Sequence, residues 1–274
     1  MFVMKSDRLS NNQYLPILSI SEQEIEILKL TPSAWIESTN GIEMSGENVT
    51  LIRDKTGKTS WKPVGANAPR IVLSNKVPVL NFGPGRGVSN SGAIRAENGY
   101  ESFPQNGEYT LFILYRAPVP NQGGYNGTGG NLCGNNTAAP DWLRVRLGSD
   151  SYLSDAAWIN HGGTAVSDPT NYPINTAIAG FRDNLWHTAV IEVSSAYHRW
   201  EHDGTLRQLS SQAAKPFLTP ESRMLIIGGA GNPLSHGWQG DIAAVLLIPK
   251  VVSDTDKAMI YQRLNAMKAR LTST

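Results

Sequence analysis

The sequence predicts an all-β protein, an antiparallel β-sandwich with a short N-terminal helix and a C-terminal helix. Charged residues make up only 17% of the 274 residues, whereas turn formers are abundant, with 26 Gly and 16 Pro. Short apolar or alternating segments recur along the chain, as strands of a sandwich do. Residues 186–204 read as consecutive antiparallel strands that end on Asp203-Gly204, a dipeptide typical of two-residue hairpin turns. These three observations together favour strands joined by turns over helices.

The first element along the chain is a short helix. Ser21 and Glu24 match a capping box, with Ser21 as N-cap and Glu24 at the third helical position, which predicts a helix over about residues 22–29. On this helix Glu22, Glu24 and Glu26 are expected to form a solvated face. The alternative is a strand that aligns the three acids as paired carboxylates, as in some glycosidases, and the capping box favours the helix.

From Pro32 onward the pattern changes to strands. The segments that we expect to form strands before and after the hairpin region are residues 34–36, 49–58, 69–72, 78–82, 109–116, 143–147, 224–229 and 240–248. The last two are nearly continuous apolar runs, which are typical of strands buried on both faces. The Gly/Asn-rich stretch 121–136 is interpreted as a long loop, because strand patterns resume on both sides of it.

The chain closes with a helix over about residues 253–271. Ser253 is its predicted N-cap, and Asp256 occupies the capping-box position where the helix dipole also favours an acid. One apolar face is formed by residues spaced four, three and four apart, namely Ile260, Leu264, Met267 and Leu271. We expect this face to lie on the sandwich; the alternative is contact with a neighbouring protomer. The chain therefore divides into an N-terminal arm, residues 1–31, and one sandwich domain, residues 32–274.

Charge and composition argue against several classes of function. The net charge is +1, and no basic run with interleaved aromatics is present, so we expect no nucleic-acid partner. No segment approaches the roughly 20 apolar residues of a membrane helix, and residues 1–7 hold no signal-peptide core, so neither a membrane partner nor secretion is expected. The single Cys133 cannot form an intramolecular disulfide. An extracellular role without a signal peptide is consistent with a virion component released by lysis.

Several segments in this order resemble the concanavalin A-like lectin/glucanase family, including its laminin-G-like members. They are the hairpin from Trp186-His187 to Asp203-Gly204 and the closing run "LIIGG … GWQGDIAAVLL" followed by "SDTDKAMIYQRL". The earlier order of a Trp strand, a turn with Asp and Gly, and a "PxLxF" strand resembles the opening of bacterial and phage laminin-G-like domains. The resemblance covers about residues 35–264 and implies a jelly-roll sandwich. It implies no single function, because this fold carries lectins, hydrolases and structural modules.

Catalysis is not expected. Hydrolases of this family carry three alternating acids on one strand, in a pattern close to ExDxxE. The nearest match, Glu201-His202-Asp203, lacks a third acid, and Asp203 is required by the turn. His187 is expected to satisfy a backbone group, and the sequence contains no Ser/His/Asp order, P-loop or His/Cys metal cluster.

No cofactor is expected, and a structural calcium ion is the alternative. In the family, acids at strand ends sometimes help to hold calcium, and Asp54 and Asp241 each lie near a Gly at such an end. Calcium needs six to eight oxygen ligands, and no dense acidic loop is present. We therefore interpret both acids as turn-capping residues.

A glycan site requires aromatic faces for sugar rings and amide or charged groups for hydroxyls. The region richest in both lies between residues 121 and 172. The candidate ligand-binding residues are Tyr125, Asn131, Asn135, Trp142, Trp158, Asn160 and His161. The alternative for the two tryptophans is a place in the core.

The sequence-based hypothesis for function is a non-catalytic, lectin-like domain of a phage tail fibre or related virion protein that attaches to a bacterial surface glycan. Its expected partners are a cell-surface polysaccharide and other virion proteins, with a homo-oligomer, such as the trimer common among fibre proteins, as a further expectation. The alternative is a structural virion component, such as a decoration or baseplate protein. A polysaccharide hydrolase or lyase is the third hypothesis.

Overall fold

The computed structural model describes residues 22–65, 67–83, 92–119, 130–135, 143–147, 156–161, 174–177, 182–229 and 237–273. Within these residues the chain forms seventeen strands and two α-helices, which confirms the all-β fold class with a helix near each end. The helices are α1 (Glu22–Lys29) and α2 (Asp254–Thr272). The strands are β1 (Ala34–Glu37), β2 (Ile42–Ser45), β3 (Asn48–Arg53), β4 (Ser60–Val64), β5 (Arg70–Ser74), β6 (Val77–Asn81), β7 (Ala93–Ala96), β8 (Tyr109–Arg116), β9 (Gly130–Asn135), β10 (Leu143–Leu147), β11 (Ala156–His161), β12 (Ile174–Ala177), β13 (Trp186–Val193), β14 (His198–His202), β15 (Thr205–Ser210), β16 (Leu225–Ile227) and β17 (Asp241–Ile248).

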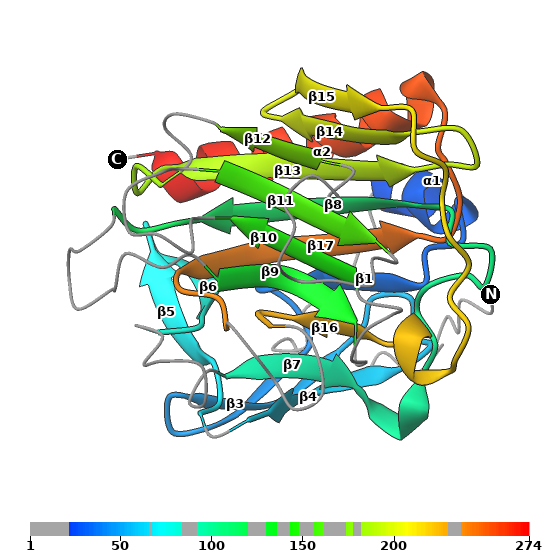
Figure 1. Ribbon diagram of the computed structural model, residues 1–274. Coiled ribbons are helices and arrows are strands. Elements are labelled where there is room, and N and C mark those ends of the chain that lie inside the picture. The colour runs from blue at the N-terminus through cyan, green and yellow to red at the C-terminus, as the bar shows by residue number, and fades with distance from the viewer. Residues whose placement is uncertain are drawn as a thin grey trace.

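The strands form two packed layers (Figure 1). The first, which we call the helix-side sheet, runs in the order β15-β14-β13-β8-β17, and β17 then pairs with both β1 and β6. The second, which we call the far sheet, runs in the order β2-β3-β4-β7-β16-β9-β10-β11-β12. The two are connected where β5, the neighbour of β6, pairs with β3 at Asn48 and Arg70. All of these strand pairs are antiparallel.

Strand β8 lies at the centre of the helix-side sheet and explains why the molecule has two cores. Its side chains alternate between the two faces, as a pleated strand requires. Leu111, Ile113 and Tyr115 belong to the cluster between the two sheets, whereas Phe112 and Leu114 belong to a second cluster on the outer face. Strands β13 and β17, which flank β8, are buried along their entire length, because they are covered on both faces.

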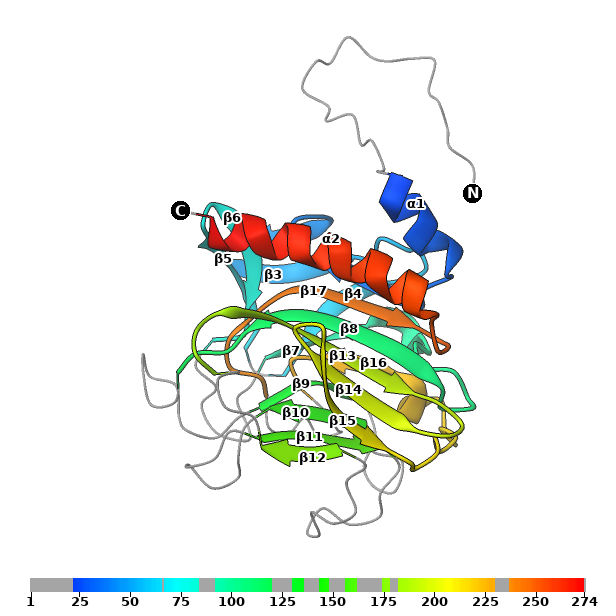
Figure 2. The same cartoon turned by 90° about the horizontal axis from the view of Figure 1, so that it is seen from above.

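The second core lies beneath the two helices, which cover the outer face of the helix-side sheet (Figure 2). Ile260, Leu264 and Leu271 of α2 are at most 4% exposed, so the predicted apolar face lies on the sandwich. Ser253 caps α2 as predicted, because its Oγ accepts a hydrogen bond from the backbone N–H of Asp256 at 3.1 Å. Ile27 places α1 in the same core at 0% exposure. None of the described helices is both long enough and apolar enough to cross a membrane.

The long loop predicted over residues 121–136 is wrong at its C-terminal end. Residues Gly130–Asn135 form β9, a buried strand between β10 and β16. Glycine and asparagine disfavour strands, so local propensity gave no strand signal. The glycine is required by close backbone packing, because a Cβ at Gly130 would lie 2.1 Å from the carbonyl oxygen of Gly237.

Candidate functional site

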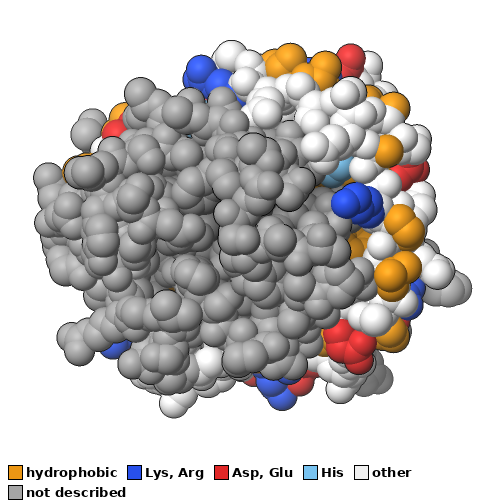
Figure 3. Space-filling view, viewed as in Figure 1, with side chains coloured by type: hydrophobic (Ala, Val, Ile, Leu, Met, Phe, Trp, Pro, Cys, Tyr) orange, Lys and Arg blue, Asp and Glu red, His pale blue; other side chains and the backbone are white. Residues whose placement is uncertain are grey.

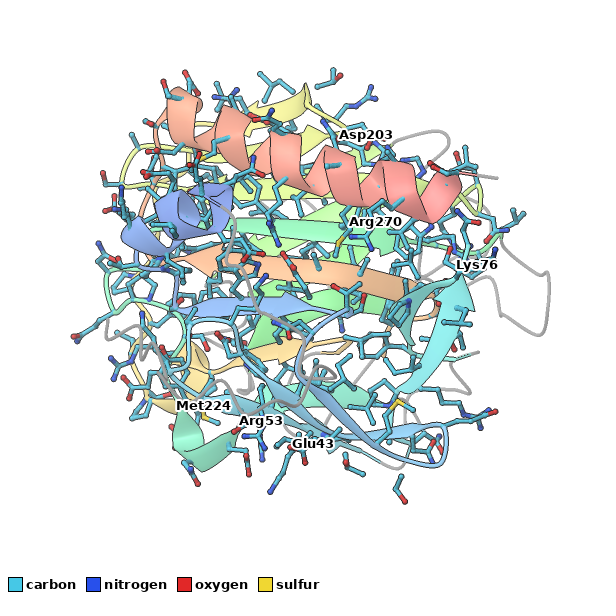
Figure 4. All side chains as sticks on the ribbon, turned by 180° about the vertical axis from the view of Figure 1, so that it is seen from behind. Glu43, Arg53, Lys76, Asp203, Met224 and Arg270 are labelled. Carbon is cyan, nitrogen blue, oxygen red and sulfur yellow. The ribbon has the colours of Figure 1, made fainter. Side chains whose placement is uncertain are left out.

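A pocket of about 550 Å³ opens between the two helices and the edge of the helix-side sheet. Its lining comes from α1, β1, the turn after β1, the segment after β3, and α2. The lining residues are Gln23, Glu24, Leu28, Trp35, Glu37, Thr39, Asn40, Lys55, Arg263, Leu264, Ala266, Met267 and Arg270. Figure 4 shows the face that carries α2, with Arg270 and Asp203 at opposite margins of this helix. We call this cavity the helix pocket.

The base of the helix pocket is a buried carboxylate that binds an arginine through two bonds. Glu37, on β1, is 4% exposed. Arg263 of α2 donates from Nε to Glu37 Oε1 at 2.7 Å and from a terminal nitrogen to Oε2 at 2.8 Å. The indole N–H of Trp35 donates to the same Oε1 at 3.0 Å. Two parallel N–H···O bonds are the strongest arrangement available to an Arg–carboxylate pair, so this contact fixes α2 on β1.

A second acid and a second cation complete the cluster. Lys55 Nζ lies 2.6 Å from Glu24 Oε1 and 3.0 Å from Glu37 Oε2. Arg263 also contacts Glu24 Oε1 at 2.5 Å, which ties α1 to α2. The two cations lie over the Trp35 ring, with Lys55 Nζ 4.6 Å and the Arg263 guanidinium carbon 5.3 Å from its centroid. Each charge in the cluster therefore has partners of opposite sign, and the ring adds cation–π attraction.

Both acids of the cluster are ionised at neutral pH. Burial opposes ionisation of Glu37, but the hydrogen bond from Arg263 and the charges of Lys55 and Arg263 outweigh it and hold the pKa of Glu37 below its ordinary value. Burial likewise opposes ionisation of Glu24, and Lys55 and Arg263 hold the pKa of Glu24 below its ordinary value. A general acid for glycoside hydrolysis needs the opposite shift, a raised pKa.

The mouth of the helix pocket offers a different set of groups. Thr39 and Asn40 are exposed on the turn after β1, and Arg270 is exposed on α2. Within the described part of the chain, no ion pair engages Arg270. Leu28 and Met267 add apolar walls. Hydroxyl, amide and guanidinium groups beside apolar walls are the chemistry that binds a small polar molecule.

The residues predicted for glycan binding fall on the far sheet or outside the described residues. Tyr125 and Trp142 lie outside the described residues. Asn131 and Asn135 lie on β9 and are buried, and Asn135 donates to the carbonyl of Ser222 at 2.9 Å. The other three, Trp158, Asn160 and His161, lie on β11.

The backbone register brings some of these positions into rows across the far sheet. Arg146 of β10 pairs with Asn131 on one side and with Trp158 on the other. Arg144 pairs in the same way with Asn160 and with Gly134, the neighbour of Asn135. Each of the two rows therefore crosses β9, β10 and β11. The role of these residues in glycan binding stays a prediction.

The two acids considered for calcium have different partners. Asp54 is a turn-capping residue as predicted, because its Oδ1 accepts from the backbone N–H of Thr56 at 2.7 Å. Its Oδ2 accepts from the backbone N–H of Trp35 and from the indole of Trp61, both at 3.0 Å. Burial outweighs these bonds and raises the pKa of Asp54. Asp241 instead pairs with an arginine, accepting from Arg116 Nε at 2.8 Å.

The hairpin carries the predicted turn, but its histidine has a different role from the one expected. Asp203 and Gly204 both have positive φ, 48° and 74°, as a type I′ turn requires. His187 was expected to satisfy a backbone group, and it contacts two carboxylates instead: its Nδ1 lies 2.7 Å from Asp203 Oδ2, and its Nε2 lies 2.9 Å from Asp183 Oδ1. Burial opposes protonation of His187, but these two acids prevail and raise its pKa.

Sequence reasoning missed the helix pocket and its cluster. Glu24 was expected on a solvated face, whereas its side chain is only 16% exposed and pairs with two cations. The apolar stripe of α2 carried a signal for a separate ion pair outside the helix pocket, since Lys257 lies on this stripe three residues before Ile260. A charge on such a stripe indicates a buried ion pair, and Lys257 indeed lies 2.8 Å from Glu192 of β13.

The fold is similar to that of solved β-sandwich domains. The chain superposes on domain 4 of AbnA, a GH43 extracellular arabinanase from Geobacillus stearothermophilus in complex with arabinotriose, with a TM-score of 0.57 at 10% identity, over 85% of this chain and 97% of that one. It also superposes on a mutant Trypanosoma rangeli sialidase with trans-sialidase activity, with a TM-score of 0.54 at 12% identity, over 88% of this chain and 33% of that one.

A third similar structure is the binding domain of botulinum neurotoxin DC in complex with rat synaptotagmin II, with a TM-score of 0.53 at 10% identity, over 84% of this chain and 52% of that one. Identities this low show a shared β-sandwich fold alone and carry no information about activity. The sequence matches no protein-family model and no curated protein. The narrower assignment to the concanavalin A-like family therefore stays a prediction.

Proposed function

We propose that this protein is a non-catalytic, lectin-like domain that binds a glycan in the helix pocket. The observation that carries the proposal is the pocket itself, whose volume of about 550 Å³ lies within the range of small-molecule sites. Its mouth presents the hydroxyl of Thr39, the amide of Asn40 and the guanidinium of Arg270 beside apolar walls. These groups suit sugar hydroxyls and, at Arg270, an anionic substituent such as a uronic carboxylate.

The non-catalytic part of the proposal is supported by the state of the two acids. Glu24 and Glu37 are each in contact with Arg263 and Lys55, and the pKa of each lies below its ordinary value. Neither therefore holds a proton that could be given to a leaving group at neutral pH. Glycoside hydrolysis by a carboxyl pair requires one protonated acid, so this cluster suits binding better than cleavage.

The biological setting that we propose is a virion protein, such as a phage tail fibre, that attaches to a bacterial surface polysaccharide. This part rests on the order of the early strands, which resembles the opening of phage laminin-G-like domains. Along the margin seen in Figure 3, the described surface carries acidic, basic and apolar side chains interspersed with one another. Other virion proteins and further copies of this chain would then be its protein partners.

Titration calorimetry with bacterial surface polysaccharides tests this proposal. Asn40→Ala and Arg270→Gln remove two groups at the mouth of the pocket, and each is expected to weaken binding about 10-fold, since lost polar contacts cost about 1–2 kcal/mol. Arg207→Gln, at an exposed position on β15, is the matched control and should leave the affinity unchanged.

Each alternative predicts a different outcome. A structural virion protein would bind no polysaccharide in its folded form, which would overturn the proposal. A hydrolase or lyase would release new reducing ends from the same polysaccharides. Binding that neither pocket variant weakens would place the site elsewhere, with the region of residues 121–172 as the next candidate.

A further inference from the structure

The hairpin strands bring two histidines together on one face of the helix-side sheet. In the register of β13 and β14, Ala189 lies opposite His202, so His187, two residues earlier on β13, is the diagonal neighbour of His202 on the same face. Their rings stack with centroids 4.7 Å apart and an interplanar angle of 29°. Asp203 directly follows His202, and the type I′ turn directs its carboxylate back toward both rings.

The donor atoms of these three residues converge. Asp203 Oδ2 lies 2.7 Å from His187 Nδ1 and 3.9 Å from His202 Nδ1. One ligand atom from each residue lies within 4.8 Å of the others, and no other such group of three occurs among the described residues. In a tetrahedral zinc site with bonds of about 2.0–2.1 Å, two donor atoms lie about 3.3 Å apart. That value falls between the two distances, so movements of about 0.6 Å would bring both Asp203–histidine distances to it.

The outer nitrogens of both rings are already held. His187 Nε2 lies 2.9 Å from Asp183 Oδ1, and His202 Nε2 lies 3.1 Å from the hydroxyl of Tyr115. Histidines that bind metals use their second nitrogen in this way, which fixes the ring orientation and the tautomer. Both imidazoles are buried, at 7% and 3% exposure, so their orientation does not depend on mobile surface side chains.

The remaining carboxylate oxygen is used by the protein. Asp203 Oδ1 accepts from the backbone N–H of Thr188 at 3.0 Å and from Lys268 Nζ at 2.9 Å. Oδ2, which contacts His187 Nδ1 at 2.7 Å, is therefore the oxygen that a metal would bind, displacing the proton shared in this contact. The Lys268 charge opposes a bound cation. Its contact with Asp203 therefore lowers metal affinity while the geometry of the two imidazoles favours it.

We propose that His187 Nδ1, His202 Nδ1 and Asp203 Oδ2 form a binding site for a divalent first-row transition metal, in particular Zn²⁺. Two imidazole nitrogens and one carboxylate oxygen are a donor set suited to zinc, and three protein ligands leave a fourth position for water or another ligand. The site lies on the hairpin at one margin of α2, whereas Arg270 of the helix pocket lies at the other (Figure 4). It is independent of the proposed glycan binding.

Calorimetry with ZnCl₂ on the untagged full chain, together with the visible absorption spectrum of the Co²⁺-loaded protein, tests this site. One metal ion per chain and a tetrahedral Co²⁺ spectrum are expected. His202→Gln, which removes a ligand, should weaken binding at least about 10-fold. His198→Gln, a buried histidine whose Nδ1 lies 2.7 Å from the carbonyl oxygen of Gln212, is the matched control and should bind as the wild type does.

Lys268→Met supplies a second readout that leaves the ligands intact. Removal of this charge should tighten Zn²⁺ binding by about 5-fold or more. The proposal would be overturned by a wild-type chain that takes up no Zn²⁺, or by His202→Gln and His198→Gln weakening binding equally. Should His202→Gln fail to fold by circular dichroism, Lys268→Met decides: tighter binding supports the site, and unchanged affinity refutes it.

Discussion

Arg263 of α2 and Glu37 of β1 form a two-bond ion pair between residues separated by 226 positions in the sequence. The carboxylate is 4% exposed, and the guanidinium also contacts Glu24 of α1. This pair connects both helices to the edge strand of the helix-side sheet. It also forms the base of the helix pocket, so the same contact stabilises the fold and shapes the proposed glycan site.

Arg263→Met is expected to destabilise the protein by about 3–5 kcal/mol, because it leaves the buried carboxylate of Glu37 with fewer partners for its charge. Urea unfolding followed by tryptophan fluorescence measures the change in the free energy of unfolding. Arg270→Met, on the same helix but exposed, is the control and should shift stability by no more than about 0.5 kcal/mol. Equal effects of the two variants would show that Lys55 alone is sufficient to compensate the buried charge of Glu37.

The Glu24 ion pairs should make stability depend on pH in the acid range. The pKa of Glu24 is depressed in the folded state from an ordinary value of 4.5. A depressed carboxyl pKa stabilises the fold above the ordinary value, and this contribution is lost as the pH falls through the folded pKa. Glu24→Gln should therefore cost about 1 kcal/mol near neutral pH and progressively less below about pH 4.5.

The control for this pH effect is Glu22→Gln, an exposed acid on the same helix. No ion pair engages Glu22 within the described residues, so this substitution should change stability by no more than about 0.5 kcal/mol. Chemical unfolding at a series of pH values gives both differences. A cost of Glu24→Gln that does not shrink on acidification would contradict the role assigned to its ion pairs.

The fold was predictable from the sequence because its central strands carry their own signals. Residues 109–116, 186–193 and 241–248 are apolar or alternating runs, and they became the three adjacent strands β8, β13 and β17. Strand β9 gave no such signal, since Gly130 is selected by contact with the backbone of Gly237 rather than by strand propensity. Tertiary packing, rather than local propensity, therefore accounts for the formation of this strand.

The candidate site was much less predictable than the fold. Glu24 and Arg263 belong to segments 239 residues apart, and a single sequence carries no information on which distant charges will meet. Their helices were predicted, but the side-chain partners were not. The histidine cluster shows the same limit: the hairpin and its turn were predicted, whereas the contact of His187 with Asp183 and Asp203 depends on side-chain directions that strand alternation does not specify.

The single thiol of Cys133 should report unfolding. Cys133 is 0% exposed on β9, and burial raises the pKa of its thiol well above the ordinary value. The thiolate is the reactive form, so the native protein should not react with an aromatic disulfide reagent. After denaturation, each chain should release one equivalent of the coloured thiolate from the reagent. Rapid labelling of the native chain would mean that the far sheet opens at β9 on a short timescale.

Two glycines with positive φ should differ sharply in their tolerance of alanine. Gly46, in the turn between β2 and β3, has a φ of 60°, and a Cβ there would meet no heavy atom within 4 Å. Gly240, just before β17, has a φ of 132°, and its Cβ would lie 2.4 Å from the carbonyl oxygen of Arg116 on β8. Gly46→Ala should cost only the backbone strain, about 1 kcal/mol, because L-residues rarely adopt this conformation.

Gly240→Ala should cost at least about 3 kcal/mol, since a backbone clash is added to the strain and neither β8 nor β17 can move without disturbing both cores. Urea unfolding of the two variants beside the wild type gives the two free-energy differences, and Gly46→Ala serves as the control for the φ effect alone. A cost of Gly240→Ala as small as that of Gly46→Ala would mean that the paired backbones of β8 and β17 can shift apart near Arg116. The central sheet would then be less rigid at this end than its complete burial implies.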